Sequence, residues 1–232
     1  IENLDPWVPN FNFFDLNAKL SYKPTRDDLI TFSFYSGEDN LVETSDTRRF
    51  QYPNFGDIDE IEIRGDLDRI SRWGNNGYSF KWSRQWNPKF FNSLNVSYSQ
   101  YYNYQDDSYF VNAIIPDLDS TIFDLSVILD QDNKVEDFTA RYDAELLSGK
   151  NNKFEFGLEF TRSEIDYLFV RDDTLSIIDN SQLSDLYSAY ISYNLTSVKN
   201  LNLKVGLRAS RYELTKNNYL APRFQLDYEF IK

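Results

Sequence analysis

Apolar and polar residues alternate with a period of two through most of this chain, and this alternation constrains its fold more than any other feature. Successive side chains of an extended strand point to opposite faces, so the pattern predicts strands with one apolar and one mostly polar face. It recurs in nine segments: 13–22, 30–35, 78–83, 94–99, 138–146, 154–161, 189–195, 201–210 and 223–230. Helical spacing is scarce, so the predicted fold class is all-β.

The connections between these segments alternate in length. Short turns are expected at Pro24–Asp27, Asn87–Lys89, Ser148–Asn152 and Thr196–Asn200, whereas long loops are expected at about 37–72, 103–134 and 166–185. The long segments hold most of the acidic residues, and the rest of the chain is close to neutral. Tight turns at one end and long loops at the other are the layout of an antiparallel up-and-down transmembrane β-barrel, whose loops are extracellular.

Composition excludes several functional classes. The chain has no His and no Cys, so it cannot hold a Ser-His-Asp triad, a zinc finger, an iron–sulfur cluster or a disulfide. Its net charge of -13 argues against a nucleic-acid partner, which requires a basic surface. Glu155 and Glu159 lie about 13 Å apart along one strand, too far for the ~5–9.5 Å separation of glycosidase carboxylates. We therefore expect no enzymatic activity and no cofactor.

A membrane barrel is favoured over a soluble β-sandwich acting as a binding module, which is the alternative that such alternation allows. Strands of about ten residues suit a tilted crossing of the bilayer. Aromatic residues gather near both strand ends, as in two interfacial girdles. The turn-end group is Tyr22, Trp86, Phe90, Phe91, Tyr193 and Phe230, and the loop-end group is Tyr35, Trp73, Tyr102, Tyr104, Tyr167, Tyr187 and Tyr212. These features predict a location in the bacterial outer membrane, in contact with its lipid.

The second face of the predicted strands is too polar for a dry core. Its charged residues are Lys19, Lys81, Arg141, Asp143, Glu145, Glu155, Glu159, Lys204, Arg208, Arg223 and Asp227. A wide lumen that holds water or a plug tolerates such residues, whereas a small packed core does not. The solvent-exposed side of a soluble sheet would tolerate them equally.

Three stretches carry a resemblance to a known family. Leu201–Phe230 contains Gly206-Leu207-Arg208 followed by Pro222-Arg223, and it resembles a recurrent strand, loop and Pro-Arg strand of TonB-dependent outer-membrane receptors of Bacteroidetes. Val135–Ile165 and Asp15–Leu41 are similar to other barrel strands of the same family. The order and spacing of these stretches, from about Asp15 onward, carry the resemblance.

This resemblance implies a transporter that imports a siderophore, vitamin, glycan or peptide through a 22-stranded barrel closed by a plug, with TonB acting through that plug. Nine strands are too few for such a barrel, and neither a plug nor a TonB box is visible. We therefore expect residues 1–232 to form one incomplete barrel segment whose first and last strands pair with other polypeptide. The lumen-facing residues Arg141, Glu159 and Arg208 are then expected to contact the plug. The alternative is a complete small outer-membrane barrel acting as an adhesin or scaffold.

Two further groups of residues are candidates for ligands. The acidic run Gly56–Asp68 offers carboxylates for Ca²⁺ but lacks the spacing of a dedicated calcium loop, so a solvated acidic segment is favoured. Its candidate ligands are Asp57, Asp59, Glu60, Asp66 and Asp68. Tyr101, Tyr102 and Tyr104 offer rings that could stack on a sugar or another cyclic ligand, although an interfacial girdle is favoured there.

A hairpin is expected where two apolar runs flank a turn signal. Tyr109–Ile115 and Thr121–Leu129 stand on either side of Pro116-Asp117-Leu118-Asp119. Apolar runs above a membrane require burial, either against the other loops or against a partner such as a surface lipoprotein.

Overall fold

The computed structural model describes residues 9–55, 58–115, 120–149, 152–196 and 200–230, without the side chains of 46–55, 58–60 and 120. It contains nine strands in one antiparallel sheet whose spatial order equals the chain order. They are β1 (Asn10–Tyr22), β2 (Asp28–Phe55), β3 (Ile58–Asn87), β4 (Phe90–Ile115), β5 (Ser120–Ser148), β6 (Asn152–Arg171), β7 (Leu175–Leu195), β8 (Leu201–Tyr212) and β9 (Asn217–Tyr228). The predicted all-β fold, nine-strand count and antiparallel up-and-down order are confirmed.

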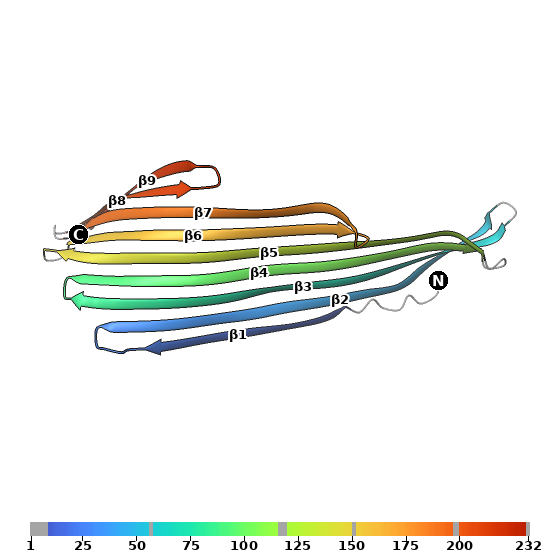
Figure 1. The fold of residues 1–232 in the computed structure, drawn as a ribbon, viewed down its shortest axis with the longest axis horizontal. Coiled ribbons are helices and arrows are strands. Elements are labelled where there is room, and N and C mark those ends of the chain that lie inside the picture. The colour runs from blue at the N-terminus through green and yellow to red at the C-terminus, as the bar shows by residue number, and fades with distance from the viewer. Residues whose placement is uncertain (1–8, 56–57, 116–119, 150–151, 197–199, 231–232) are drawn as a thin grey trace.

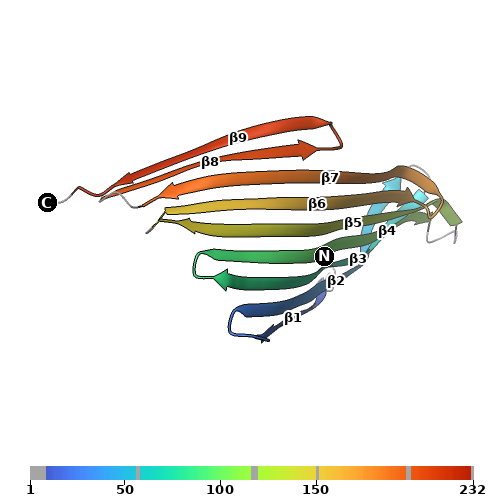
Figure 2. The same cartoon turned by 60° about the vertical axis from the view of Figure 1, so that its left-hand side comes forward.

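The strands form a single layer, with β1 and β9 at its two edges (Figures 1 and 2). A β-sandwich needs two sheets that face each other, and the described strands provide only one. The soluble-sandwich alternative is therefore wrong. The described part of the chain contains no helix that is long and apolar enough to cross a membrane.

Where they are described, the segments expected to be long loops are mainly paired strand, which corrects the interpretation of 37–72, 103–134 and 166–185. The four strands β2–β5 run for 26 to 30 residues, and they reach well past the ends of β6 and β7 (Figure 1). Cross-strand pairing continues from Asp28↔Arg84 at the turn end to Phe55↔Ile58 at the far end. The ladder needs only backbone groups, so it persists where the apolar alternation that marks the first part of each strand breaks down. We call these three segments the distal extensions.

The short turns lie where the sequence predicts them. In the turn between β3 and β4, the side-chain Oδ1 of Asn87 accepts hydrogen bonds from the backbone N–H groups of Lys89 and Phe90, which stabilises the reversal. At the opposite end of the sheet, Asp172 and Asp173 both have positive φ, 51° and 55°. Two consecutive residues with positive φ make the tight hairpin turn that joins β6 to β7.

A single sheet leaves both of its faces uncovered. Among the described residues only Ile115 and Ala144 are buried apolar residues, and no large side chain is fully buried. The accessible surface is 16443 Å², whereas a compact folded chain of 27.5 kDa exposes about 11,000 Å². The excess surface shows that the described strands do not enclose a core of their own, so their exposed apolar side chains need other apolar material against them.

The sheet is also open at its edges. Within the described residues β1 pairs only with β2 and β9 pairs only with β8. Strand direction reverses at every step, so β1 and β9 run in the same direction. The prediction that the first and last strands do not pair with each other is confirmed.

Candidate functional site: two opposite faces of one sheet

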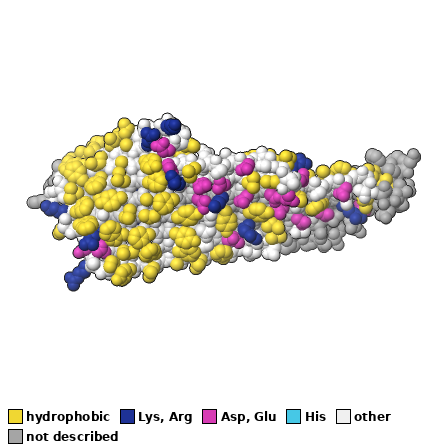
Figure 3. Space-filling model, in the orientation of Figure 1, with side chains coloured by type: hydrophobic (Ala, Val, Ile, Leu, Met, Phe, Trp, Pro, Cys, Tyr) yellow, Lys and Arg dark blue, Asp and Glu magenta, His cyan; other side chains and the backbone are white. Residues whose placement is uncertain are grey.

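One face of the sheet is apolar over the half that lies next to the short turns. A single row of paired residues crosses all nine strands on this face: Tyr22, Ile30, Trp82, Leu94, Tyr142, Leu158, Ala189, Ala209 and Leu220. All of its members are at least partly exposed, for example Leu158 at 61%. Figure 3 shows the hydrophobic side chains as one continuous area over this half, with acidic side chains beyond it. We call this the apolar face.

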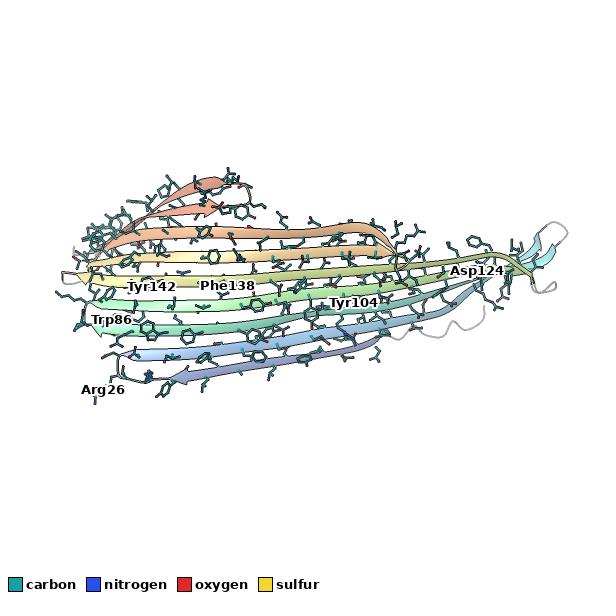
Figure 4. All side chains as sticks on the ribbon, in the orientation of Figure 1. Arg26, Trp86, Tyr104, Asp124, Phe138 and Tyr142 are labelled. Carbon is teal, nitrogen blue, oxygen red and sulfur yellow. The ribbon has the colours of Figure 1, made fainter. Side chains whose placement is uncertain are left out.

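Aromatic side chains border the apolar face at both ends. At the turn end, the indole N–H of Trp86 donates to Asn92 Oδ1 at 2.9 Å, and Asn92 Nδ2 donates to the Tyr142 hydroxyl at 3.3 Å (Figure 4). At the distal end, Phe34, Tyr78, Tyr98 and Phe138 occupy successive positions in one paired row. Trp86 and Tyr187 lie where the predicted girdles put them. Other predicted girdle residues alternate with the apolar-face residues of their own strands and so belong to the opposite face, namely Tyr35, Trp73, Phe91, Tyr167 and Tyr212.

The apolar face is long enough to cover most of the apolar core of a bilayer. Phe138 and Leu146 lie at its two ends on β5, a separation of about 26 Å along the strand. Strands of outer-membrane barrels tilt by about 35–45°, so this length covers about 20 Å of the apolar band of about 25 Å that aromatic girdles border in such barrels. The sheet is therefore built as the wall of an outer-membrane β-barrel, with the apolar face toward lipid.

The opposite face of the same strands is charged and connected by ion pairs, and we call it the charged face. Arg208 Nη2 donates to Glu159 at 2.6 Å, and Arg141 Nη1 lies 3.5 Å from the other oxygen of Glu159. Arg141 Nε also bonds both oxygens of Asp143, at 2.8 and 3.0 Å. The hydroxyl of Tyr190 donates to Asp143 at 2.6 Å. The three predicted plug contacts, Arg141, Glu159 and Arg208, therefore form one cluster drawn from three strands.

A second ion-pair group continues this cluster toward the turn end. Glu155 accepts from Lys153 at 2.6 Å, from Lys204 at 2.5 Å and from the Ser192 hydroxyl at 3.0 Å. Lys153 also bonds Glu145 at 3.2 Å. Members of both groups line a hollow of about 720 Å³ on the charged face, which Lys81 and Arg223 border; these members are Arg141, Asp143, Glu145, Glu155, Tyr190, Ser192, Lys204 and Arg208. This hollow has the polarity of a solvated or plugged lumen.

Polarity changes sides in the distal extensions. Beyond the ion-paired Arg69 and Asp107, the residues that continue the charged face are apolar: Ile63, Leu67, Tyr109, Val111, Ala113, Phe123, Leu125, Val127 and Leu129. The residues that continue the apolar face are largely polar there and include Asp66, Asp106 and Asp130. The predicted hairpin of 109–115 and 121–129 is confirmed. Its exposed large apolar side chains lie on both sides, with Phe123 and Leu125 on the side of the charged face and Phe110 and Ile122 on the other.

Carboxylates in the distal extensions bond tyrosine hydroxyls. Tyr102 donates to Glu38 at 2.6 Å, and burial together with this carboxylate raises the pKa of Tyr102 to about 12. Asp130 stands directly opposite Asp106 on the neighbouring strand. Burial, followed by the negative charge of Asp106, raises the pKa of Asp130 above its ordinary value.

The remaining predicted site residues do not meet in one place. Tyr102 and Tyr104 share one face of β4, whereas Tyr101 lies on the other, because strand positions alternate. Asp66 and Asp68 follow each other on one face of β3. Asp57 and the side chains of Asp59 and Glu60 lie outside the described residues. Where side chains are described, no three Asp or Glu residues are grouped as a metal site requires.

Sequence reasoning missed a polar cluster at the turn end of the apolar face. Asp28 is 5% exposed and accepts from the Trp82 indole at 2.9 Å and from Arg84 Nη1 at 3.1 Å. The Arg84 guanidinium also stacks on the Trp86 ring, 4.4 Å from its centroid. The signal in the sequence is Trp82, Arg84 and Trp86 at alternate positions, which places all three on one face.

No family model matches the chain, and no curated protein matches it. Solved structures of low sequence identity do align with it. The outer membrane transporter YddB from Escherichia coli aligns with 95% of this chain and 36% of its own, with 13% identity and a TM-score of 0.49. The siderophore receptor PirA from Acinetobacter baumannii aligns with 98% and 42%, with 11% identity and a TM-score of 0.38.

The translocator domain of the autotransporter NalP from Neisseria meningitidis aligns with 96% of this chain and 76% of its own, at 10% identity and a TM-score of 0.30. The chain thus spans 36% of the transporter and 42% of the siderophore receptor. Likenesses at these scores carry no argument about activity, so substrate and partners are matters of proposal.

Proposed function

We propose that this chain forms part of the barrel wall of a TonB-dependent outer-membrane transporter that imports a nutrient. The observation that supports this most strongly is the pairing of two faces on one sheet. One face carries an apolar band between aromatic borders. The other carries the ion-paired cluster of Arg141, Glu159 and Arg208, of which Arg141 and Arg208 line a hollow. A polar interior behind a lipid-facing exterior is what a transport conduit requires.

The open edges favour a segment of a larger barrel over a complete small barrel that acts as an adhesin or scaffold. Unpaired backbone groups cost several kcal/mol each in lipid, so β1 and β9 need partners. Because β1 and β9 run in the same direction, an all-antiparallel closure requires an odd number of additional strands between them. Neither direct closure nor a second copy in the same orientation supplies that pairing.

The charged face is the surface on which a plug would rest. Arg141, Glu159 and Arg208 are partly exposed, and their ion pairs hold their side chains in place. A plug surface with complementary charges would add hydrogen bonds to this cluster without the need to organise it first. TonB would then act through the plug, in polypeptide beyond this sheet.

Finer aspects of the proposal rest on the sequence resemblance. The Gly206-Leu207-Arg208 and Pro222-Arg223 pieces support a receptor of Bacteroidetes type, and here they lie side by side, since Leu207 pairs with Pro222. The apolar side of the distal β4–β5 hairpin could meet the other loops or a surface lipoprotein. Siderophores, vitamins, glycans and peptides all remain candidate substrates.

Growth assays test the proposal. A strain that lacks the natural polypeptide should lose growth when one substrate class is supplied as the limiting nutrient, namely a ferric siderophore, a vitamin, a glycan or a peptide. Deletion of the TonB energy-coupling protein should reproduce the same defect. Normal growth on all four classes, together with loss of surface adhesion, would instead establish the adhesin alternative.

A further inference from the structure

Cationic side chains gather at the turn end of the sheet, beside the apolar face. Lys23 and Arg26 lie in the β1–β2 turn, and Lys89 lies in the β3–β4 turn; all three are exposed. Among the described residues none of their side chains forms an ion pair or hydrogen bond. The two turns are adjacent, because Gln85 N donates to Asp27 O at 2.9 Å. Figure 3 shows basic side chains at this end of the molecule, and Figure 4 places Arg26 there.

An arginine held by aromatic residues stands next to these turns. Arg84 Nη1 bonds Asp28, while its guanidinium lies on the Trp86 ring. Trp86 itself is 52% exposed, at the border of the apolar face. Stacking on an indole and binding to one carboxylate keep the guanidinium in a fixed orientation at the level where lipid headgroups begin.

The charge of this end is opposite to that of the distal extensions. Lys23, Arg26, Lys89 and Arg84 outnumber the acidic residues Asp27 and Asp28 at the turns. Just beyond the other border of the apolar face, the polar residues are mainly acidic, among them Glu38, Asp106, Asp130, Asp132, Glu136, Glu164, Asp166 and Asp185. A membrane-embedded sheet with this asymmetry attracts anionic headgroups at one border only.

We propose that Lys23, Arg26, Lys89 and the stacked Arg84 form a binding site for the phosphate of an anionic phospholipid in the leaflet at the turn end. The lysines and Arg26 supply charge that no other described residue pairs with, and Trp86 supplies the interfacial ring. The apolar face directly beside the site accommodates the acyl chains, which is why a lipid rather than free phosphate is the ligand. This lipid site goes beyond the proposed transport function and does not depend on any substrate.

Native mass spectrometry of the natural polypeptide tests the site. The folded protein in detergent is incubated with equal amounts of phosphatidylglycerol and phosphatidylcholine, and retained lipids are counted. We expect phosphatidylglycerol to be retained preferentially. The triple variant Lys23→Gln, Arg26→Gln, Lys89→Gln should lower this preference at least about tenfold, because each surface charge near an anionic membrane contributes about fivefold. Trp86→Ala should lower it as well.

The matched control removes three basic residues from the other side of the apolar face: Arg72→Gln, Lys134→Gln, Arg211→Gln. It should leave the lipid preference unchanged, and heat-modifiable gel mobility should confirm that every variant is folded. Equal retention of both lipids by the unmodified protein would overturn the proposal, since the basic turns would then serve another occupant. So would an equal loss in the control, or displacement of phosphatidylglycerol by inorganic phosphate.

Discussion

On the charged face, the large side chain of Tyr190 requires a glycine at position 157. A Cβ added to Gly157 would collide with the ring of Tyr190 and would lie 2.8 Å from the Tyr142 carbonyl oxygen. Tyr190 lies across this glycine and reaches Asp143 with its hydroxyl. A tyrosine ring that covers a strand glycine on the neighbouring strand compensates for the missing side chain. Because Gly157 has no side chain, the Tyr190 ring can lie over it and reach the ion-paired cluster at Asp143.

We predict that Gly157→Ala destabilises the sheet by about 1–3 kcal/mol, the usual cost of overpacking. The thermal midpoint of heat-modifiable gel mobility would measure the loss. Gly65→Ala is the matched control, because a Cβ there would meet its nearest atom at 3.9 Å, an ordinary contact. Equal midpoints for the two variants would show that the Tyr190 ring does not need the space that Gly157 leaves.

Substitutions on the two faces should differ in cost. Leu158 lies on the apolar face opposite Tyr142, midway between the two ends of that face on β5, so Leu158→Arg should cost about 2–4 kcal/mol, as a charge near the bilayer midplane does. Lys81 on the charged face has no ion pair among the described residues, so Lys81→Gln should be nearly neutral. Folding yields in lipid vesicles measure both, and a larger loss for Lys81→Gln would reverse the assignment of faces.

At the scale of elements, the sequence predicts the membrane half of each strand and misjudges the distal half. Alternation is visible where one face meets lipid, as in Phe154–Phe160 on β6. In the distal extensions of β3 and β4 the apolar positions shift from even to odd numbers, for example to Leu67 and Val111. The alternation along the original apolar face therefore ends there. The sequence also does not reveal side-chain contacts. It shows Glu155 only as one of several charged residues on the polar face, whereas in the structure Glu155 binds Lys153 and Lys204.

Asp130 should stabilise the distal part of the β4–β5 hairpin more in acid than at neutral pH. The pKa of Asp130 is raised above 3.8, so its protonation favours the folded hairpin. This stability is fully present below 3.8 and is lost as pH rises through the folded pKa. At neutral pH Asp130→Asn should therefore slow amide hydrogen exchange around Asp106. Removing one charge of a like-charge pair should raise the free energy of local opening by up to about 1 kcal/mol.

The control is Asp185→Asn, which removes a carboxylate bound by Arg162 through two 2.8 Å contacts and should accelerate exchange in its own hairpin. In acid below 3.8, the Asp130 variant and the unmodified protein should exchange alike. Faster exchange in Asp130→Asn at neutral pH would contradict a repulsive Asp106–Asp130 pair.

At the scale of the whole molecule, the nine-strand count and the short turns follow from the sequence, since each strand half and each turn has a local signal. The cluster of Arg141, Glu159 and Arg208 was anticipated only as three residues on one face, because their meeting depends on register across β5–β8. Register itself results from all the cross-strand pairs together. The aromatic border at Trp86 was predicted, whereas its link to Arg84 and Asp28 was not.

The central claim is that one face of the sheet meets lipid and the other meets water. Because the chain has no Cys, single cysteines can be placed along β6 and treated, in intact outer membranes, with a water-soluble thiol reagent that does not enter lipid. Position 157 stays glycine, because a Cβ there collides with Tyr190. Positions 155, 159 and 161 should react, whereas 154, 156, 158 and 160 should be protected. Reaction at every position, or protection at the odd ones instead, would contradict this account.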